Sequence, residues 1–92
     1  MARVVVTLKI MPEGTDTDLD KLKEKSIKVI ESFNKKQDIR AEKEGIGFGL
    51  NALKIIFVMD EGIGSTEPLE EKLKQIKGIS SVDVVDVRRA IG

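Results

Sequence analysis

The residues that most often do chemistry in proteins are unevenly present in this sequence of 92 residues. It has no cysteine and no histidine, which excludes thiol nucleophiles, disulfides, zinc fingers and histidine acid–base catalysis. Carboxylates are plentiful, at 16 Asp and Glu in total, but none has a partner base at a useful spacing. Carboxylates that lie near one another in the sequence include Asp60 with Glu61, Glu70 with Glu71, and Asp83 with Asp86 three positions later. The sequence therefore predicts no catalytic acid–base pair and favours a protein that is not an enzyme.

A second acidic group has the alternating oxygens of a calcium-binding loop. Asp16, Asp18 and Asp20 occupy every second position, but the glycine and the terminal glutamate of an EF-hand are missing. Helix capping explains these residues better, because carboxylates stabilise the positive amino end of a helix. A Walker loop for phosphate is also missing. The sequence thus implies no metal site and no cofactor.

The glycine-rich run at residues 45–49, GIGFG, is the one local anomaly. It is not a dinucleotide fingerprint, because the third glycine comes one residue early and a strand rather than a helix follows. One interpretation is a hairpin whose glycines relieve backbone restrictions while Phe48 packs into the core. The other is a protruding contact in which Phe48 is held between Gly47 and Gly49. From the physics alone we favour the first.

A basic pair, Arg88-Arg89, stands near the carboxyl end of the chain. The ordinary interpretation of such a pair is a solubilising terminus. The alternative is a contact with a partner, because the pair closes a predicted strand at a free end and can reach outward. Both interpretations stay open on the residues alone.

Composition excludes several classes of protein. Lys plus Arg equals Asp plus Glu, at 16 each, so there is no global charge to attract nucleic acid or an anionic membrane. Tryptophan and tyrosine are absent and phenylalanine occurs three times. These are few aromatic side chains for a protein that stacks on nucleic-acid bases. The apolar runs are far too short to span a bilayer, and the first residues lead directly into a strand rather than a signal peptide. We expect a cytoplasmic protein with no membrane and no direct nucleic-acid partner.

The elements that position these residues follow from hydrophobic spacing. Residues 4–10 have a high content of β-branched side chains and the length of a strand, which predicts a strand with Val4, Val6, Leu8 and Ile10 on one face. A turn at 12–14 precedes a helix from about 17 to 33, with Thr17 as N-cap. The expected buried stripe of this helix is Leu19, Leu22, Ile27, Ile30 and Phe33, with Ser26 and Val29 on or beside it.

The second half of the chain gives three more elements. Residues 39–50 alternate weakly, and residues 52–59 form the strongest strand, whose continuous apolar run indicates a central position. A second helix is expected from Ser65 or Thr66, with Pro68 in its first turn and Gly78 as its stop. Residues 82–87 form the last strand, and the basic pair follows it.

The order strand, helix, strand, strand, helix, strand predicts one fold. Two right-handed βαβ crossovers around a hairpin give the α+β ferredoxin-like sandwich, a four-stranded antiparallel sheet with two helices on one face. Nothing marks a linker, so we expect a single domain over residues 1–92. The fold hosts many functions and does not name one. The residues favour an interaction or regulatory protein over an enzyme, with a small-molecule-binding regulatory domain and an RNA-binding module as alternatives.

The glycine run also carries a family resemblance. Residues 46–55, IGFGLNALKI, followed by FVMDE at 57–61, resemble the IGFGIKKLQI…VVED signature of the translation elongation factor 1-beta family. The opening strand, the first helix start, the second helix and the closing SVDV at 81–84 also agree. Chain length and the Arg-Arg-Ala-Ile ending resemble the archaeal form, in which this guanine-nucleotide exchange domain stands alone.

The resemblance implies a partner and a set of contacts. The partner is elongation factor 1-alpha, a GTP-binding protein from which family members promote GDP release. In the family, the hairpin aromatic that matches Phe48 contacts the G protein near its switch region. A basic residue near the carboxyl terminus approaches the Mg²⁺ and phosphate site. The implied contact residues of this chain are Gly47, Phe48, Gly49, Arg88, Arg89 and Ile91.

This chain departs from the family at its end. Eukaryotic members end in a lysine next to a final apolar residue, and our alignment places Arg89 at that lysine, with Ile91 beyond it. Arginine keeps the charge, but its planar guanidinium is not a compact ammonium. Two hypotheses follow: the tail acts at the Mg²⁺ site, or it only clamps the partner.

Overall fold

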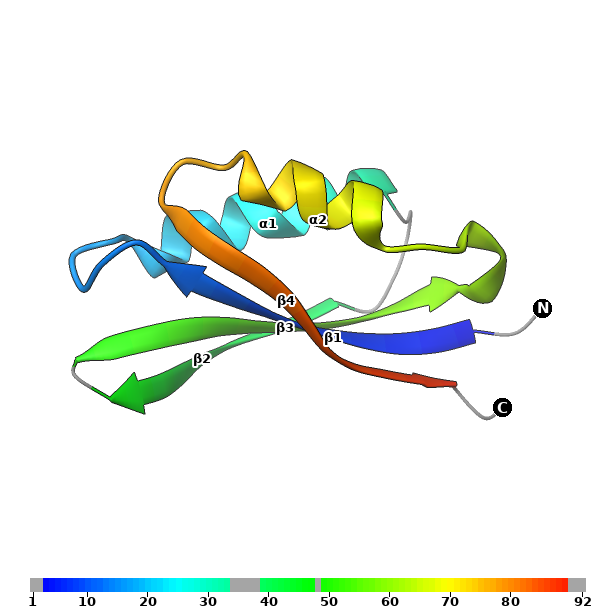
Figure 1. The fold of residues 1–92 in the computed structure, drawn as a ribbon, viewed down its shortest axis with the longest axis horizontal. Coiled ribbons are helices and arrows are strands. Elements are labelled where there is room, and N and C mark those ends of the chain that lie inside the picture. Colours follow the sequence, from blue (N-terminus) through cyan, green and yellow to red (C-terminus); the bar gives the residue numbers. More distant parts are fainter. Residues whose placement is uncertain (1–2, 34–38, 48, 90–92) are drawn as a thin grey trace.

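Four strands form one antiparallel sheet in the order β2-β3-β1-β4, and both helices lie on one side of it (Figure 1). The computed structural model describes residues 3–33, 39–47 and 49–89. The elements in chain order are β1 (Arg3–Pro12), α1 (Leu19–Phe33), β2 (Ile39–Gly47), β3 (Leu50–Asp60), the short 3-10 helix η1 (Glu61–Ile63), α2 (Glu67–Lys74) and β4 (Ile79–Arg89). This arrangement confirms the predicted α+β ferredoxin-like sandwich.

The core lies between the sheet and the two helices. Side chains of a strand alternate between its faces, and every second residue of β1 and β3 faces the helices. The strands bury Val6, Leu8, Ile10, Leu53, Ile55, Phe57 and Met59, and the helices bury Leu22, Ile30, Leu69 and Leu73. On the open face of the sheet, Ile56 and Val58 of β3 are half-buried. The central position predicted for residues 52–59 is therefore confirmed.

The N-cap of the first helix is Asp18, one residue later than the predicted cap Thr17, and the helix begins at Leu19. Oδ1 of Asp18 accepts the backbone N–H groups of Asp20 (3.1 Å) and Lys21 (3.2 Å), so Asp18 caps α1. Thr17 is not the cap, because its hydroxyl accepts the N–H of Gly14 (3.2 Å) within the preceding turn. The buried stripe of α1 is Leu22, Ser26 and Ile30. Ile27, which was expected in this stripe, is only partly buried.

The last two elements differ from their predicted bounds. Helix α2 ends at Lys74, and its C-cap is Gln75 rather than a residue next to Gly78. A turn then leads to Gly78, whose φ of 101° is in the region that favours glycine. Strand β4 continues to Arg89 instead of ending at residue 87, because it pairs with β1 as far as Val4. Arg88 and Arg89 are therefore strand residues.

Candidate partner-binding surfaces

The hairpin that joins β2 and β3 carries the glycines of the predicted contact set. Gly47 pairs with Leu50, and the ladder shifts register between Gly45 and Gly47. Gly47 has a φ of 96° and Gly49 a φ of 74°. Residues with a β-carbon rarely adopt such positive φ angles. The glycines are thus required by the backbone of this tight connection. That finding supports the predicted hairpin.

The hairpin lies against the loop between β1 and α1. A β-carbon built at Gly49 would lie 3.8 Å from Cγ2 of Thr15, whereas one built at Gly47 would meet nothing within 4 Å. Gly47 therefore faces open space. The glycine requirement at position 47 comes from its backbone conformation and not from crowding.

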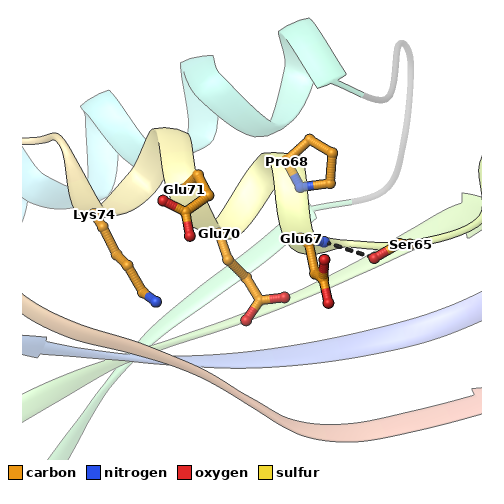
Figure 2. Close-up of a pocket in the computed structure, with 6 residues that line it drawn as sticks. All are labelled: Ser65, Glu67, Pro68, Glu70, Glu71 and Lys74. Carbon is orange, nitrogen blue, oxygen red and sulfur yellow. Dashed lines mark hydrogen bonds between the residues drawn. The ribbon is translucent and has the colours of Figure 1, made fainter.

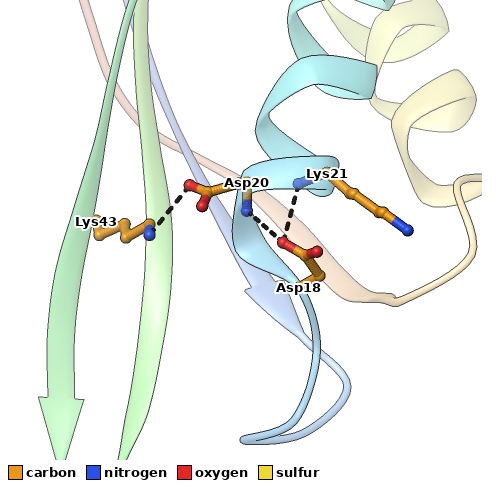
Figure 3. Close-up of polar contacts among 4 residues, drawn as sticks. All are labelled: Asp18, Asp20, Lys21 and Lys43. Atoms are coloured by element: carbon orange, nitrogen blue, oxygen red, sulfur yellow. Dashed lines mark hydrogen bonds and ion pairs between the residues drawn. The ribbon is translucent and has the colours of Figure 1, made fainter.

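Two ion pairs hold the strands that lead into the hairpin. Nζ of Lys43 in β2 lies 3.1 Å from Oδ1 of Asp20 in the first turn of α1 (Figure 3). Nζ of Lys9 in β1 lies 3.9 Å from Oε1 of Glu44 in β2, on the open face of the sheet. Both pairs are partly or largely exposed, so each contributes little stability alone. Together they connect β2 to the helix layer and to β1.

The tail arginines occupy the end of β4. Nη2 of Arg89 donates to Oε1 of Glu61 in η1 at 2.8 Å, and Nε of Arg88 lies 3.0 Å from Oδ2 of Asp86. Both guanidinium side chains are mostly exposed, at 79% for Arg88 and 70% for Arg89. Val87, beside them in β4, is 54% exposed. This end of the sheet therefore presents charged groups beside an exposed apolar side chain.

The two arginines point to opposite faces of the sheet. Arg89 pairs with Val4, which packs against the core, and Arg88 pairs with Val5. Residues opposite each other in an antiparallel pair share a face, and neighbours along a strand do not. Arg89 thus lies on the helix side and Arg88 on the open side. The two guanidinium groups have different surroundings.

The hairpin and the arginines are at opposite ends of the molecule. Strand β3 runs from Leu50 in the hairpin to Asp60, which pairs with Arg3 at the end where β4 finishes. A strand of 11 residues spans about 33 Å, most of the 42 Å longest dimension. In Figure 1 the hairpin is at the left and both termini are at the right. Among the described residues, the structure places Gly47 and Gly49 at one end of the sheet and Arg88 and Arg89 at the other, so these four do not form one cluster.

Two predicted contact residues, Phe48 and Ile91, lie outside the described residues. Gly47, Gly49, Arg88 and Arg89 are described, and all are exposed. The contact set stays a prediction for all six residues.

A cleft lies on α2, and none of its lining residues belongs to the predicted contact set. Its lining side chains are Ser65, Glu67, Pro68, Glu70, Glu71 and Lys74 (Figure 2). Oγ of Ser65 accepts the N–H of Glu67 (3.0 Å), and the hydroxyl of Thr66 donates to Oε2 of Glu70 (2.9 Å). These polar groups therefore organise the start of α2.

The described part of the chain has neither a cluster of metal-ligating side chains nor a helix that could span a membrane. Within residues 3–33, 39–47 and 49–89, no group of three or more acidic side chains is placed to hold a metal ion. No helix in that part of the chain is long and apolar enough to cross a membrane.

Comparison with known proteins identifies the family. Residues 5–90 match the model of the EF-1 guanine nucleotide exchange domain. The chain belongs to this exchange-factor family. Elongation factor 1-beta of Methanosphaera stadtmanae is 46% identical over 89 residues, which cover 97% of this chain and 98% of that protein. Elongation factor 1-beta of Staphylothermus marinus is 45% identical over 92 residues, with the same shares of the two chains.

These archaeal relatives confirm the resemblance that the hairpin motif indicated, and the family acts in nucleotide exchange on elongation factor 1. Among solved structures, the de novo designed protein Foldit4 is similar over 98% of each chain, with a TM-score of 0.63 and 17% identity. At that identity the likeness concerns the fold alone. The assignment to the exchange-factor family therefore rests on sequence similarity. The sandwich fold itself also occurs in unrelated sequences.

Sequence reasoning did not find the role of Glu61. In the sequence, Asp60 and Glu61 form a carboxylate pair without a base, whereas in the structure Glu61 is the partner of Arg89. The signal was present in the topology, because the predicted fold brings the ends of β3 and β4 to the same end of the sheet. What sequence alone does not give is the contact between side chains that are 28 positions apart.

Proposed function

We propose that this protein promotes release of GDP from elongation factor 1-alpha, so that the factor reloads with GTP during translation elongation. The observation that carries the proposal is the family match from residue 5 to residue 90, which takes in both ends of the sheet. Residues 1–92 would act as one exchange domain, in the cytoplasm, where translation takes place. Its partner would be the G protein, without direct contact to nucleic acid.

Exchange of a nucleotide needs no covalent chemistry from the protein that promotes it. A factor that binds the nucleotide-free G protein more tightly than the GDP-bound form weakens GDP binding by the same ratio, because linkage is reciprocal. What the factor needs is a surface that prefers one state of its partner. The absence of histidine and cysteine from the sequence is compatible with that task. The protein would therefore not be an enzyme in the covalent sense.

The two ends of the sheet would make different contributions. Gly47, Phe48 and Gly49 would present an apolar contact, because glycines on both sides let the chain turn sharply. Arg88 and Arg89, with Ile91 beyond them, would present positive charge to the anionic groups of the nucleotide site. A cation placed there competes with Mg²⁺ for the same groups. Contacts at both ends require a partner surface about 33 Å long, which supports a large protein partner over a small molecule.

The direct test is release of a fluorescent GDP analogue from elongation factor 1-alpha of the same organism. The G protein is loaded with the analogue and chased with unlabelled GDP, with and without this protein at one-twentieth of the G protein concentration. Chelation of Mg²⁺ serves as the control that the loaded G protein can release its nucleotide. We expect faster release, with each factor molecule serving many G protein molecules.

Two results would contradict the proposal. Acceleration that stops after one equivalent would indicate trapping of the G protein rather than exchange. If GDP release were not accelerated, although the G protein releases GDP on chelation of Mg²⁺, this protein would lack exchange activity on elongation factor 1-alpha. Thermal stabilisation by a metabolite would then favour the regulatory-domain alternative.

A further inference from the structure

The ion pair between Arg89 and Glu61 connects two elements that are distant in the sequence. Arg89 is the last residue of β4, and Glu61 is the first residue of η1, which follows β3 directly. Their contact, Nη2 to Oε1 at 2.8 Å, is the shortest side-chain ion pair in the described part of the chain. It passes from β4 to the end of β3 on the helix side of β1. The tail arginine is thus tied to a second element of the fold.

The backbone around Glu61 is fixed on both sides. Asp60 is in the ladder opposite Arg3, and the carbonyl of Glu61 accepts the N–H of Gly64 at 3.1 Å. Gly64 closes this turn with a φ of 87°, a conformation that favours glycine. The carboxylate of Glu61 therefore projects from a defined position. It can orient a flexible partner side chain.

Arg88 offers an internal comparison. Its ion pair is with Asp86, two positions earlier in the same strand, so it connects no second element. Arg88 also lies on the open face, whereas Arg89 lies on the helix side. The two arginines have the same charge and similar exposure, but only Arg89 is held by a residue from elsewhere in the chain.

We propose that Glu61 is a positioning residue for Arg89 in nucleotide exchange, an inference that rests on the proposed function. An arginine has several rotatable bonds, and ordering such a side chain on binding costs affinity. Glu61 holds the guanidinium in place before the partner arrives, which reduces that cost. Because the contact with Glu61 uses Nη2, other N–H donors of the guanidinium remain for a carboxylate or phosphate group of the partner.

The strength of the pair sets the size of the effect. An exposed ion pair shifts an equilibrium by about 1.5- to 5-fold. Such a pair is too weak to lock the arginine away from a partner, but it is strong enough to favour one orientation. Replacing Glu61 should therefore weaken the partner interaction by a few-fold and should not abolish exchange.

The experiment compares Glu61→Gln, Arg89→Ala and the double variant in the GDP-release assay, with Asp86→Asn as the matched control. We expect Glu61→Gln to raise the KM for the GDP-bound G protein about 1.5- to 5-fold and to leave kcat unchanged. Arg89→Ala should raise KM further, and adding Glu61→Gln to it should change nothing. Asp86→Asn should behave as wild type. An unchanged KM in Glu61→Gln, or faster exchange, would overturn the proposal, since faster exchange would mean that Glu61 restrains the arginine.

A variant in which the two charged residues are exchanged distinguishes a positioning role of Glu61 from a purely structural role of the ion pair. Glu61→Arg with Arg89→Glu restores the ion pair but reverses the charge that the partner meets. We expect its thermal stability to match wild type while its exchange stays as slow as that of Arg89→Ala. Recovery of exchange would show that the pair only supports the fold.

An NMR measurement tests the positioning without the partner. The order parameter of the Arg89 side-chain Nε–H should fall in Glu61→Gln and stay unchanged in Asp86→Asn. An unchanged order parameter in Glu61→Gln would overturn the proposal by itself. If wild-type protein failed to accelerate GDP release, the proposed function would fail, and this measurement would still decide whether Glu61 orients Arg89.

Discussion

The two ends of the sheet are built by different means. At the hairpin end, Gly47 and Gly49 set the geometry through backbone conformations that favour glycine. At the tail end, the backbone is an ordinary antiparallel ladder, and ion pairs from Arg88 and Arg89 set the geometry. One end therefore depends on backbone shape and the other on charged side chains.

This difference teaches how the two ends should respond to change. Backbone conformation is indifferent to salt, whereas exposed ion pairs are screened by it, with a Debye length of about 10 Å at 0.1 M ionic strength. Contacts made through the hairpin should therefore persist at high salt, and contacts made through the tail should weaken. The predictions below test this contrast, beginning with the largest expected effect.

Phe48→Ala should give the largest loss of exchange with the smallest change in the fold. If the ring is a contact residue at the hairpin, its removal should slow GDP release about 30-fold or more, as for a hot-spot aromatic. This loss should be similar at low and high salt. Thermal unfolding should stay close to wild type, because the family resemblance implies that the ring is a contact residue that projects outward.

Phe57→Ala is the matched control for that variant. Phe57 is fully buried in the core, so its truncation should cost about 3–5 kcal/mol of unfolding free energy. Small domains have about 5–15 kcal/mol in total, so this variant should be severely destabilised. If Phe48→Ala lost stability to the same degree, the ring would be a core residue and the contrast between the two ends would fail.

Replacing both arginines of the tail should give the next largest effect. Arg88→Ala with Arg89→Ala should slow exchange about tenfold at low salt, since a local cluster of charge raises association rates by at least that factor. The loss should shrink as ionic strength rises. The measurement is the rate of GDP release across a salt series.

The control for the tail removes the same charge elsewhere. Lys25 and Lys28 are exposed residues of α1, and replacing both by alanine should leave exchange close to wild type at every salt concentration. If this control lost as much as the arginine variant, net charge rather than the tail would be responsible. No loss from the arginine variant at any salt would remove the tail from the mechanism.

The sequence predicted the elements well and their ends less well, for physical reasons. Thr17 and Asp18 are both good capping residues, and the choice was decided by a hydrogen bond that Thr17 makes to Gly14 instead. Gly78 is a common helix stop, but here it serves a turn after the helix has ended at Lys74. Such choices depend on local geometry, which residue types alone do not fix.

The candidate site was predicted as a set of residues but not as an arrangement. The glycine run and the arginine pair are visible in the sequence, and the family match confirms the resemblance that singled them out. Their separation follows only from the antiparallel order of the strands, which places Leu50 and Asp60 at opposite ends of β3. The face of the sheet on which Arg88 and Arg89 each lie depends on the register between β4 and β1. A shift of that register by one residue would exchange the two faces.

The glycines of the hairpin should show a smaller effect, on stability. Gly47→Ala and Gly49→Ala each force a β-carbon into a positive-φ conformation, which costs about 1 kcal/mol. Gly62→Ala is the matched control, because nothing lies within 4 Å of a β-carbon there and its φ is not in the positive region. Chemical denaturation should show the loss for the hairpin glycines alone. An equal loss at Gly62, where alanine fits the backbone, would show that the positive φ of the hairpin glycines is not the cause of their loss.

The smallest effect should come from a residue between the two ends. Ser26 lies in the middle of α1, fully buried, and its Oγ has no hydrogen-bond partner among the described residues. A buried hydroxyl without a partner is destabilising, and alanine is also the better helix former. Ser26→Ala should therefore raise the unfolding free energy by about 0.5–1 kcal/mol, measured by denaturation, while exchange stays unchanged. Ser32→Ala, at an exposed position of the same helix, should gain only the part due to helix propensity. A loss of stability in Ser26→Ala would show that the hydroxyl is satisfied, for example by a buried water, and that the core tolerates it for that reason.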